Sequence, residues 1–210
     1  ESQYVMEWLT NYSGSFGKHN VKAMAGYSYQ YSQYSGLKAF NKDFPNDALG
    51  ADNLVTGEFN KEEGEVNMGS YKNDAKLIAF FGRVSYNYDE KYLITASLRR
   101  DGSSRFGVNS KWGTFPAVSA GWKINEEAFL KDVDWISLLK LRASWGKAGN
   151  DNIGGNYPSI ALLGTYTTSW NGALVSGAAP SNIANQDLQW EATKSLNFGF
   201  DFSAFQNRLQ

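Results

Sequence analysis

Few side chains in this sequence are of the types that carry out nucleophilic, acid–base or metal chemistry. The 210-residue chain has one histidine and no cysteine, which excludes a disulfide framework and a thiolate metal site. Serine–histidine catalysis would have to use His19, which follows Gly17 and Lys18 in a short polar stretch. A solvated histidine is the commoner outcome in a turn, and no second group converges on it in the sequence. We therefore expect no catalytic residue.

Two polar runs are candidates for a cation site. Glu62-Glu63-Gly64-Glu65 lies in a long predicted loop, and Asn150-Asp151-Asn152 follows a predicted strand. Clustered carboxylates suit calcium, but a solvated charge run and turn-forming Asn and Asp residues explain the two segments more simply. We expect no metal and no cofactor.

The composition limits both the partners and the fold class. Lys and Arg number 20 against 21 Asp and Glu, whereas a nucleic-acid binder normally shows a clustered basic excess. The chain is only 42% hydrophobic although 15% of it is aromatic. No run of about 18 apolar residues could form a transmembrane helix. A polar average with many aromatic and glycine residues favours β structure, including strands of a membrane barrel.

Strands must position these side chains, because apolar and polar residues alternate with a period of two. The ranges Leu77–Tyr88 and Tyr92–Asp101 flank the polar tripeptide Asp89-Glu90-Lys91, which is the pattern of a hairpin. Strands are predicted at 7–16, 21–30, 77–88, 92–101, 114–124, 138–148 and 189–202, with the start of another at Leu209. A short amphipathic helical turn is expected within Glu126–Leu130 and Trp135–Leu138. The predicted fold class is all-β and antiparallel.

The predicted connections differ in length at the two ends of the strands. Long segments at 31–75 and 149–188 leave one end, whereas tight turns at 17–19 and 89–91 close the other. Outer-membrane barrels combine short periplasmic turns with long extracellular loops. The connection at 125–137 is of intermediate length. The loop lengths therefore favour a segment of a transmembrane β-barrel.

Charge is also distributed unevenly between the two predicted faces. The charged residues on the more apolar face are Arg100, Lys147 and Lys194, all in strand halves near the long loops, where long side chains reach out of hydrocarbon. A charge at the bilayer midplane costs about 2–4 kcal/mol. We therefore predict that the other face lines a wet lumen. The lumen candidates are Arg83, Arg99, Asp101, Lys140 and Arg142. They could brace the wall electrostatically or contact a polar substrate.

Aromatic residues gather at two levels of the predicted strands, as in the interfacial girdles of membrane barrels. The predicted girdle residues are Tyr86, Tyr88, Tyr92, Trp122 and Phe202 near the tight turns, and Trp8, Tyr27, Tyr29 and Trp190 near the long loops. The strand propensity of aromatic residues is the simpler alternative. Trp112, Tyr157, Tyr166 and Trp170 lie in predicted loops, where they could stack on sugar rings or pack the loops.

Several longer motifs follow one another in the second half of the chain. They are Asp101-Gly102-Ser103-Ser104-Arg105-Phe106-Gly107, Trp112-Gly113-Thr114-Phe115-Pro116, Ser119-Ala120-Gly121-Trp122, Leu141-Arg142-Ala143-Ser144-Trp145-Gly146-Lys147-Ala148-Gly149-Asn150, Leu188-Gln189-Trp190-Glu191-Ala192-Thr193 and Asn207-Arg208-Leu209. In this order they resemble the SusC/RagA family of TonB-linked outer-membrane proteins. The resemblance is firmest over residues 77–209.

The resemblance implies a transporter of the bacterial outer membrane with a barrel of roughly 22 strands around an amino-terminal plug. Members of this family import nutrients too large for porins, typically glycans or peptides. A SusD-like surface lipoprotein covers the barrel, and the TonB complex supplies energy. We find no signal peptide, TonB box, plug or barrel-closing carboxyl-terminal strand in residues 1–210. We therefore expect about seven or eight barrel strands of a longer protein, bordered by outer-membrane lipid, with the energy-coupling parts elsewhere.

A second class of protein remains open. In a soluble or surface-exposed all-β carbohydrate-binding module, the same aromatic residues would grip sugar. The segregated loop lengths and the charge-cleared face favour the transporter segment. A barrel enzyme is a third hypothesis, weakened by the single histidine.

Overall fold

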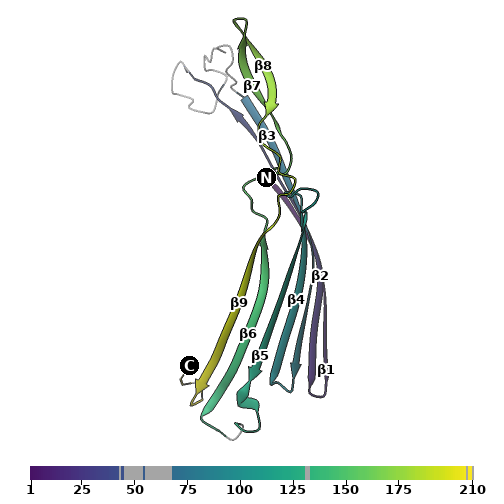
Figure 1. Cartoon of the computed structure of the whole chain (residues 1–210), viewed down its shortest axis with the longest axis vertical. Coiled ribbons are helices and arrows are strands. Elements are labelled where there is room, and N and C mark those ends of the chain that lie inside the picture. Colours follow the sequence, from purple (N-terminus) through teal and green to yellow (C-terminus); the bar gives the residue numbers. More distant parts are fainter. Residues whose placement is uncertain (43, 45–53, 55–67, 131–132, 207, 210) are drawn as a thin grey trace.

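The computed structural model describes residues 1–42, 44, 54, 68–130, 133–206 and 208–209. The strands among them are β1 (Ser2–Phe16), β2 (His19–Ala39), β3 (Met68–Tyr88), β4 (Tyr92–Ser103), β5 (Trp112–Lys123), β6 (Ile136–Asn150), β7 (Leu163–Trp170), β8 (Ala173–Pro180) and β9 (Glu191–Ala204). Seven strands form one antiparallel sheet in the order β1-β2-β3-β4-β5-β6-β9, and β7 and β8 form a separate hairpin (Figure 1). The chain therefore runs up and down through the sheet, and the hairpin is inserted between β6 and β9.

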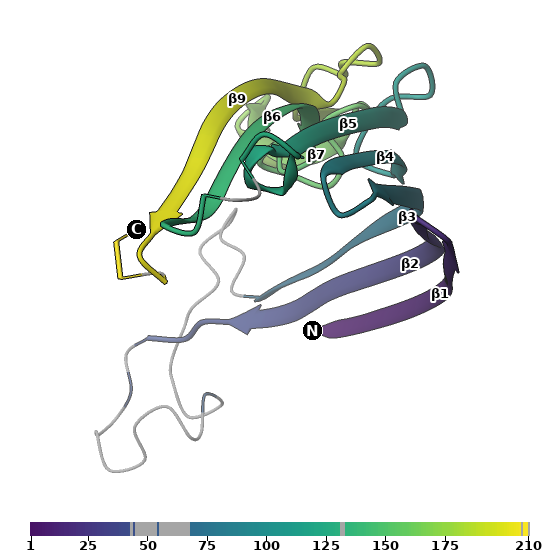
Figure 2. The ribbon, with the colours of Figure 1, turned by 90° about the horizontal axis from the view of Figure 1, so that it is seen from below.

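The sheet is curved and open. Seen from below, its strands follow one another in an arc from β1 to β9 (Figure 2). Strand twist and curvature of this kind let an antiparallel sheet form a barrel wall. The prediction of an all-β antiparallel fold is confirmed. No helix in the described part of the chain is long and apolar enough to cross a membrane.

The two ends of the sheet differ, and we name them by their connections. The turn end carries the connections 17–18, 89–91, 124–135 and 205–208, and the loop end carries 40–67, 104–111 and 151–190. In the β3–β4 turn, Asp89 and Glu90 have φ values of 51° and 55°. Positive φ at both central residues is the type I′ geometry, which matches the twist of paired strands. The predicted hairpin at 77–101 is therefore confirmed.

Strands β2 and β3 are longer than the alternation predicts. Their pairing continues without interruption to Ala39 and Met68, so both strands project beyond the rest of the sheet (Figure 1). Most residues of this projection are exposed. A strand that buries neither face needs no apolar alternation, and its pattern fades in the sequence. The predicted 31–75 loop is thus reduced to residues 40–67.

The predicted loop at 149–188 also contains strands that sequence analysis missed. β7 and β8 are joined by Asn171 and Gly172, with φ values of 52° and 81°. Asn-Gly is a strong signal for a two-residue hairpin turn. Its flanks lack an apolar alternation, because every residue of β8 and nearly every residue of β7 is exposed.

The predicted helical turn before β6 is wrong. The described residues between β5 and β6 include a short 3₁₀ turn, η2 (Ile124–Glu126), and β6 begins at Ile136. Pairing of β6 with β9 continues past a bulge to Ile136 and Ala204, so the neighbouring strand overrides the local helical pattern. At the other end of β9, Leu209 forms only an isolated bridge with Ala204.

Candidate functional site on the polar face and at the loop end

Large apolar side chains are exposed mainly on one face of the sheet. Directly paired residues of antiparallel strands share a face, so the register places Trp8 with Tyr27 and Phe80, and Tyr88 with Tyr92 and Trp122. The exposed large apolar residues of this apolar face are Tyr4, Met6, Trp8, Tyr12, Phe16, Phe80, Val84, Tyr92, Ile94, Leu98, Trp112, Val118, Trp122, Leu141, Trp145, Leu196, Phe198 and Phe200. We call the opposite face the polar face. Among the described residues outside the β2–β3 projection, its exposed large apolar side chains are Val5 and Leu9.

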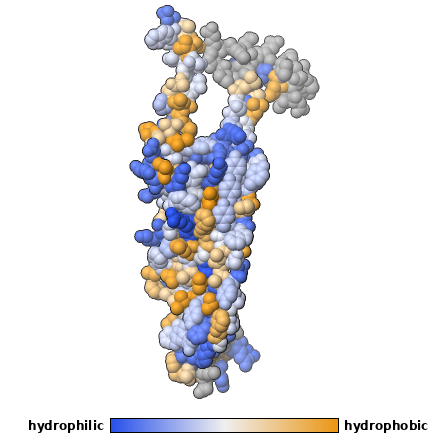
Figure 3. Space-filling model, turned by 90° about the vertical axis from the view of Figure 1, so that its right-hand side faces the viewer, coloured by the Kyte–Doolittle hydropathy of each residue, from blue (hydrophilic) through white to orange (hydrophobic). Residues whose placement is uncertain are grey.

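An apolar face of this size is unfavourable in water. Burial of apolar surface is worth about 25 cal/mol per Å², and soluble monomers rarely expose contiguous patches beyond a few hundred Å². In the space-filling view, orange apolar side chains are spread over the strand region (Figure 3). This face therefore suits contact with hydrocarbon or with another apolar surface.

The five predicted lumen residues all lie on the polar face, but they do not form one cluster. Arg99 and Asp101 form an ion pair near the loop end, with 2.8 Å between Nε and Oδ2. The Arg99 guanidinium also lies 5.4 Å from the centre of the Phe81 ring. Arg83 lies nearer the turn end and forms no ion pair with a described residue.

Lys140 and Arg142 form a second group closer to the turn end. Both approach the carboxylate of Asp201, with N–O distances of 3.9 Å for Lys140 and 3.2 Å for Arg142. The Arg142 side chain crosses Gly199, where an added Cβ would lie 2.7 Å from Nε. A glycine at 199 therefore makes room for the guanidinium. The alternation placed Asp201 on this face, but nothing in the sequence indicated that it would serve two cations.

Three of the four predicted loop aromatics lie in two different environments. Trp112 is the first residue of β5 rather than a loop residue, and the register places it on the apolar face. There it stacks on Phe80 at 6.2 Å, and the Arg100 guanidinium lies 5.4 Å from its ring. Tyr166 and Trp170 are exposed on the β7–β8 hairpin, Trp170 to 75%.

Three of the predicted girdle residues at the turn end form a continuous row on the apolar face. Tyr88, Tyr92 and Trp122 stack on one another with centroid distances of 6.3 and 6.5 Å. The Tyr92 hydroxyl and the Trp122 indole NH both donate to Oε1 of Glu127, at 2.6 and 3.0 Å. The hydrogen bond from Tyr92, followed by that from Trp122, holds the pKa of the Glu127 carboxyl below its usual value. The row thus has a polar rim, as interfacial aromatic residues require.

The remaining girdle candidates at this end also contact neighbours. The hydroxyl of Tyr86 lies 2.7 Å from Nδ1 of His19, which is the first residue of β2. Phe202 packs edge-on against Trp135 at 6.5 Å.

No group of three or more metal-ligating side chains occurs among the described residues. The acidic run at 62–65 lies outside the described residues.

The girdle candidates at the loop end divide into two groups. Trp8 and Tyr27 are paired on the apolar face, and Tyr29 lies on the same face two residues further along β2. Trp190 instead packs between Phe106 and Phe115, with centroid distances of 4.9 and 5.3 Å. Its contacts are therefore those of a small aromatic core that joins the β4–β5 loop to the start of β9.

This aromatic core contains the largest fully buried side chain among the described residues, that of Phe106. Phe106 is 1% exposed and Phe115 is 8% exposed. The Trp190 indole NH donates to the Lys111 carbonyl oxygen at 3.1 Å, which fixes the ring against the β4–β5 loop. An added Cβ at Gly107 would meet the Gln186 carbonyl oxygen, so the glycine permits the close approach of these two loops.

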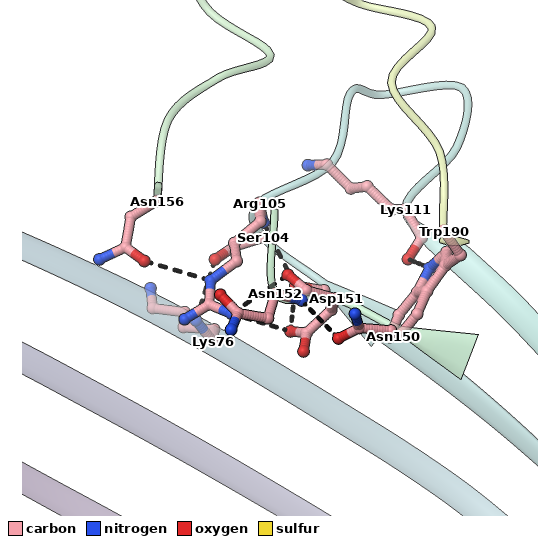
Figure 4. Close-up of polar contacts among 10 residues, drawn as sticks. Lys76, Ser104, Arg105, Lys111, Asn150, Asp151, Asn152, Asn156 and Trp190 are labelled. Atoms are coloured by element: carbon pink, nitrogen blue, oxygen red, sulfur yellow. Dashed lines mark hydrogen bonds and ion pairs between the residues drawn. The ribbon is translucent and has the colours of Figure 1, made fainter. Parts of the chain in front are cut away.

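A polar cluster next to this core, the loop-end clasp, consists of Lys76, Ser104, Arg105, Asp151 and Asn156 (Figure 4). Arg105 donates from Nε to Asn156 Oδ1 at 3.1 Å and from Nη1 to the Asp151 carbonyl oxygen at 3.2 Å. Its Nη1 also lies 3.4 Å from the Asp151 carboxylate. Ser104 bonds to Lys76 in both directions: its amide donates to the Lys76 carbonyl oxygen, and its hydroxyl accepts from the Lys76 amide, each at 2.9 Å.

The next contact extends the clasp to the projecting strands. The Tyr157 hydroxyl donates to Asp74 Oδ1 at 2.6 Å and accepts from the Asp74 amide at 2.9 Å. The hydrogen bond to the carboxylate raises the pKa of the Tyr157 phenol above its ordinary value. Residues 151–157, which lead to the hairpin, are thereby attached to β3 and to the β4–β5 loop.

Comparison with known proteins gives these features a family. The model of the family described as "TonB dependent receptor-like, beta-barrel" matches residues 2–210. The chain belongs to this family. TonB-dependent receptor P39 of Formosa agariphila is 44% identical over 205 residues, which are 95% of this chain and 18% of that protein. TonB-dependent receptor SusC of Bacteroides thetaiotaomicron is 39% identical over 143 residues, which are 67% of this chain and 14% of that protein.

The solved structure of the RagAB peptide transporter has the same fold. It superposes with a TM-score of 0.86 at 29% identity, over 98% of this chain and 22% of that chain. The SusC/RagA resemblance inferred from the motifs is confirmed. The chain therefore spans about a fifth of the length of the relatives that it matches. The structure also accounts for the motif at 101–107: Asp101, Ser103 and Phe106 are buried, and Arg105 belongs to the clasp.

Proposed function

We propose that residues 1–210 are part of the barrel wall of a TonB-dependent receptor in the bacterial outer membrane, which imports large nutrients into the periplasm. One observation carries this proposal: a single continuous sheet exposes large apolar side chains on one face and carries its polar side chains on the other. Lipid on one side and an aqueous lumen on the other require this arrangement. The soluble carbohydrate-binding module does not account for the exposed apolar face.

The partners follow from the family. We propose glycans or peptides as substrates, a SusD-like surface lipoprotein at the loop end, and energy from the TonB complex through regions outside residues 1–210. A plug and the other barrel strands also belong to the proposed receptor, of which this chain is the barrel segment. The name of the RagAB relative, a peptide transporter, supports the peptide alternative.

The site residues take different roles in this proposal. The shared carboxylate of Asp201 and the Arg99–Asp101 pair support a bracing role for four of the five lumen candidates. The exposed rings of Tyr166 and Trp170 on the hairpin are the aromatic residues best placed to meet a substrate outside the barrel. The hydrogen bond of Tyr157 to Asp74 and the ring packing of Trp190 suit a structural role for these two residues.

The first experiment tests the barrel itself. Membranes of the native source are extracted with detergent and run on a gel with and without boiling, using an antibody against residues 149–188. We expect a band that needs detergent for extraction and changes mobility on boiling, because closed barrels resist unfolding. A soluble band that is indifferent to heat would reject the proposal in favour of the binding module.

The second experiment tests the hairpin. In the full-length receptor, Trp170→Ala should reduce substrate uptake while the heat-modifiable band stays unchanged. Ile183→Ala is the matched control, because Ile183 is 95% exposed in the same connection but is not aromatic. Normal uptake by the Trp170 variant would remove this residue from the proposed substrate site.

A further inference from the structure

Three cations lie on the apolar face near the loop end. Lys147 follows Trp145 by two positions in β6, and the register pairs it directly with Lys194 of β9. Arg100 of β4 lies on the same face, opposite Phe80. Like charges directly opposite each other destabilise a strand pair. The pairing of Lys147 with Lys194 therefore stays under repulsion unless an anion lies between the two ammonium groups.

Aromatic rings hold two of these cations on the wall. The Arg100 guanidinium lies 5.4 Å from the centre of the Trp112 ring, and the Lys147 ammonium lies 5.8 Å from that of Phe115. Such contacts attract a cation to the face of the ring but neutralise none of its charge. Arg100 and Lys194 are exposed, and Lys147 is half-buried. All three cations can therefore reach an anion bound at the outer surface of the wall.

The carboxylates of the loop end do not neutralise these cations. No described residue forms an ion pair with any of the three. Glu1 and Glu7 lie before and within β1, which is three strands away from β4. Asp187 is exposed in the connection that precedes β9. The described carboxylates near the loop end that have other partners are Asp74, Asp101, Asp151 and Glu191.

A polar hollow of about 250 Å³ opens beside Lys147. Thr114 and Lys147 line it from the apolar face, and Asn109, Ser110 and Gln189 line it from the adjoining connections. No carboxylate is among its lining residues. An ammonium group beside amide and hydroxyl donors is suited to bind the oxygens of a phosphate. The hollow belongs to the outer surface of the wall, on the side away from the polar face.

A second hollow, of about 480 Å³, lies deeper on the apolar face. It forms because Ala120 and Ala143 are directly paired and larger apolar side chains surround them. The larger side chains include Trp122, Leu141 and Phe198. Ala143 is four residues from Lys147, which is about 13 Å along a strand. One leaflet of hydrocarbon is about 15 Å thick, so the two hollows match the headgroup and the acyl chain of one lipid.

We propose that Arg100, Lys147 and Lys194 bind the phosphate-bearing headgroup of a membrane lipid, with one of its acyl chains in the apolar hollow. This proposal rests on the proposed membrane location and adds a lipid ligand to it. Charge complementarity selects an anionic lipid, because cations at the membrane surface attract anionic headgroups. A headgroup without net charge leaves the repulsion between Lys147 and Lys194 in place. The lipid lies outside the barrel, so neither the lumen nor a plug takes part.

Native mass spectrometry of the purified, delipidated full-length receptor tests this site. The probes are lipid A with two phosphates, lipid A with the same acyl chains after removal of both phosphates, and phosphatidylcholine. We expect the diphosphorylated lipid to bind about tenfold more tightly than either of the other two, because only its headgroup carries net negative charge. Equal affinities for the three lipids overturn the proposal.

Matched charge variants locate the binding site. Lys147→Gln with Lys194→Gln should weaken binding of diphosphorylated lipid A about tenfold. Lys22→Gln with Lys123→Gln removes the same charge from the polar face and should leave the affinity nearly unchanged, since neither lysine forms an ion pair with a described residue. Equal affinities in the two double variants overturn the proposal.

Assembly of each variant is checked by its heat-modifiable band on gels. If the first double variant does not assemble, Lys194→Gln alone serves, because this side chain is exposed at the wall. The single variant should weaken binding by about threefold. An unchanged affinity in an assembled Lys194→Gln receptor overturns the proposal in the same way.

Two further arms test the acyl chain. Ala143→Phe fills the apolar hollow and should weaken lipid binding several-fold while the preference for phosphate remains. An unchanged affinity overturns the placement of the acyl chain. Glycerol 1-phosphate carries the phosphate without acyl chains, and a large excess of it should not displace the lipid. Displacement assigns the cations to a free phosphate compound and overturns the lipid assignment.

These measurements need neither a transported substrate nor an energy source. A soluble band that is indifferent to heat would reject the proposed membrane barrel. A heat-modifiable receptor that binds the three lipids equally would reject this lipid site alone. The two failures are therefore distinguishable.

Discussion

The turn end and the loop end of the sheet are built by different means. At the turn end, most connections are short, and the stacked row of Tyr88, Tyr92 and Trp122 joins residues of consecutive strands. At the loop end, Arg105 bonds to residues 46 and 51 positions away, and Tyr157 bonds to Asp74, 83 positions away. Local pairing is thus sufficient at one end, whereas the other depends on side chains that meet only after the sheet has formed.

This difference indicates where a barrel wall needs buried contacts. Strands satisfy their backbone groups through their neighbours and gain little from a core of their own. The long connections have no such neighbours, so they need the aromatic core and the clasp to hold them above the sheet. Substitutions at the loop end should therefore change the connections and leave the strands in place.

The largest expected effect is at Phe106. Phe106→Ala should lower the free energy of local opening of the 104–111 connection by about 3–5 kcal/mol, because a fully buried ring is removed from packed surroundings. Hydrogen exchange of the purified receptor measures this. Phe129→Ala, at the turn end and 69% exposed, should change local opening by no more than about 0.5 kcal/mol. Equal effects at the two positions would contradict the comparison.

The Arg105–Asp151 pair should follow. Each of Arg105→Gln and Asp151→Asn should cost the segment 151–157 about 1–3 kcal/mol, because a partly buried charge loses its partner. The double variant should cost less than the sum by about 1 kcal/mol, since both residues act in one contact. Hydrogen exchange in a double-mutant cycle tests this, and strict additivity would show that the two side chains act independently.

Tyr157 gives a smaller effect with a pH signature. Tyr157→Phe should cost about 1 kcal/mol of clasp stability. The neutral phenol makes the bond and its folded pKa is raised. The contribution is therefore complete below the ordinary tyrosine pKa and is lost as pH rises through the higher folded value. Spin labels on cysteines introduced at Ser70 and Ser176 should report a broader distance distribution above that pH. In Tyr157→Phe, the distribution should be broad already at neutral pH.

Glu127 should show the smallest effect. Glu127→Gln keeps an acceptor for Tyr92 and Trp122 but weakens both bonds, and we expect no change in barrel assembly on gels. The folded pKa of Glu127 lies below its ordinary value of 4.5. Its contribution is therefore present above that value and is lost as pH falls through the lower folded value. The Trp122 emission, obtained by subtracting the spectrum of a Trp122→Phe variant, should shift in that acid range only with Glu127 present.

Prediction from the sequence was most successful for the strands that bury or expose distinct faces. The period-two patterns at 77–88 and 92–101 give the hairpin and its two faces, because an apolar and an aqueous environment impose opposite demands on alternate residues. The same reasoning underestimated β2 and β3, whose projecting halves meet neither demand. The β7–β8 hairpin was missed for the same reason, although Asn171-Gly172 was a readable signal.

The candidate site was predictable only in part. Alternation placed Arg83, Lys140 and Arg142 on the polar face, where the register also has them. The shared partner of Lys140 and Arg142 was not predictable, because the contact with Asp201 depends on which strand lies beside β6. Trp112 and Trp190 were placed in the wrong surroundings, since the packing of a strand end against a loop leaves no periodic trace in the sequence.

The sequence by itself determined the fold class, the two faces of the wall, the tight turns and the family, because each depends on spacing within one strand or on a contiguous motif. The tertiary structure alone decided which distant side chains meet: Phe106 with Trp190, Arg105 with Asp151, and Tyr157 with Asp74. Such contacts join segments whose separation in sequence is set by loop length, and loop length leaves relative position open until the sheet fixes both ends.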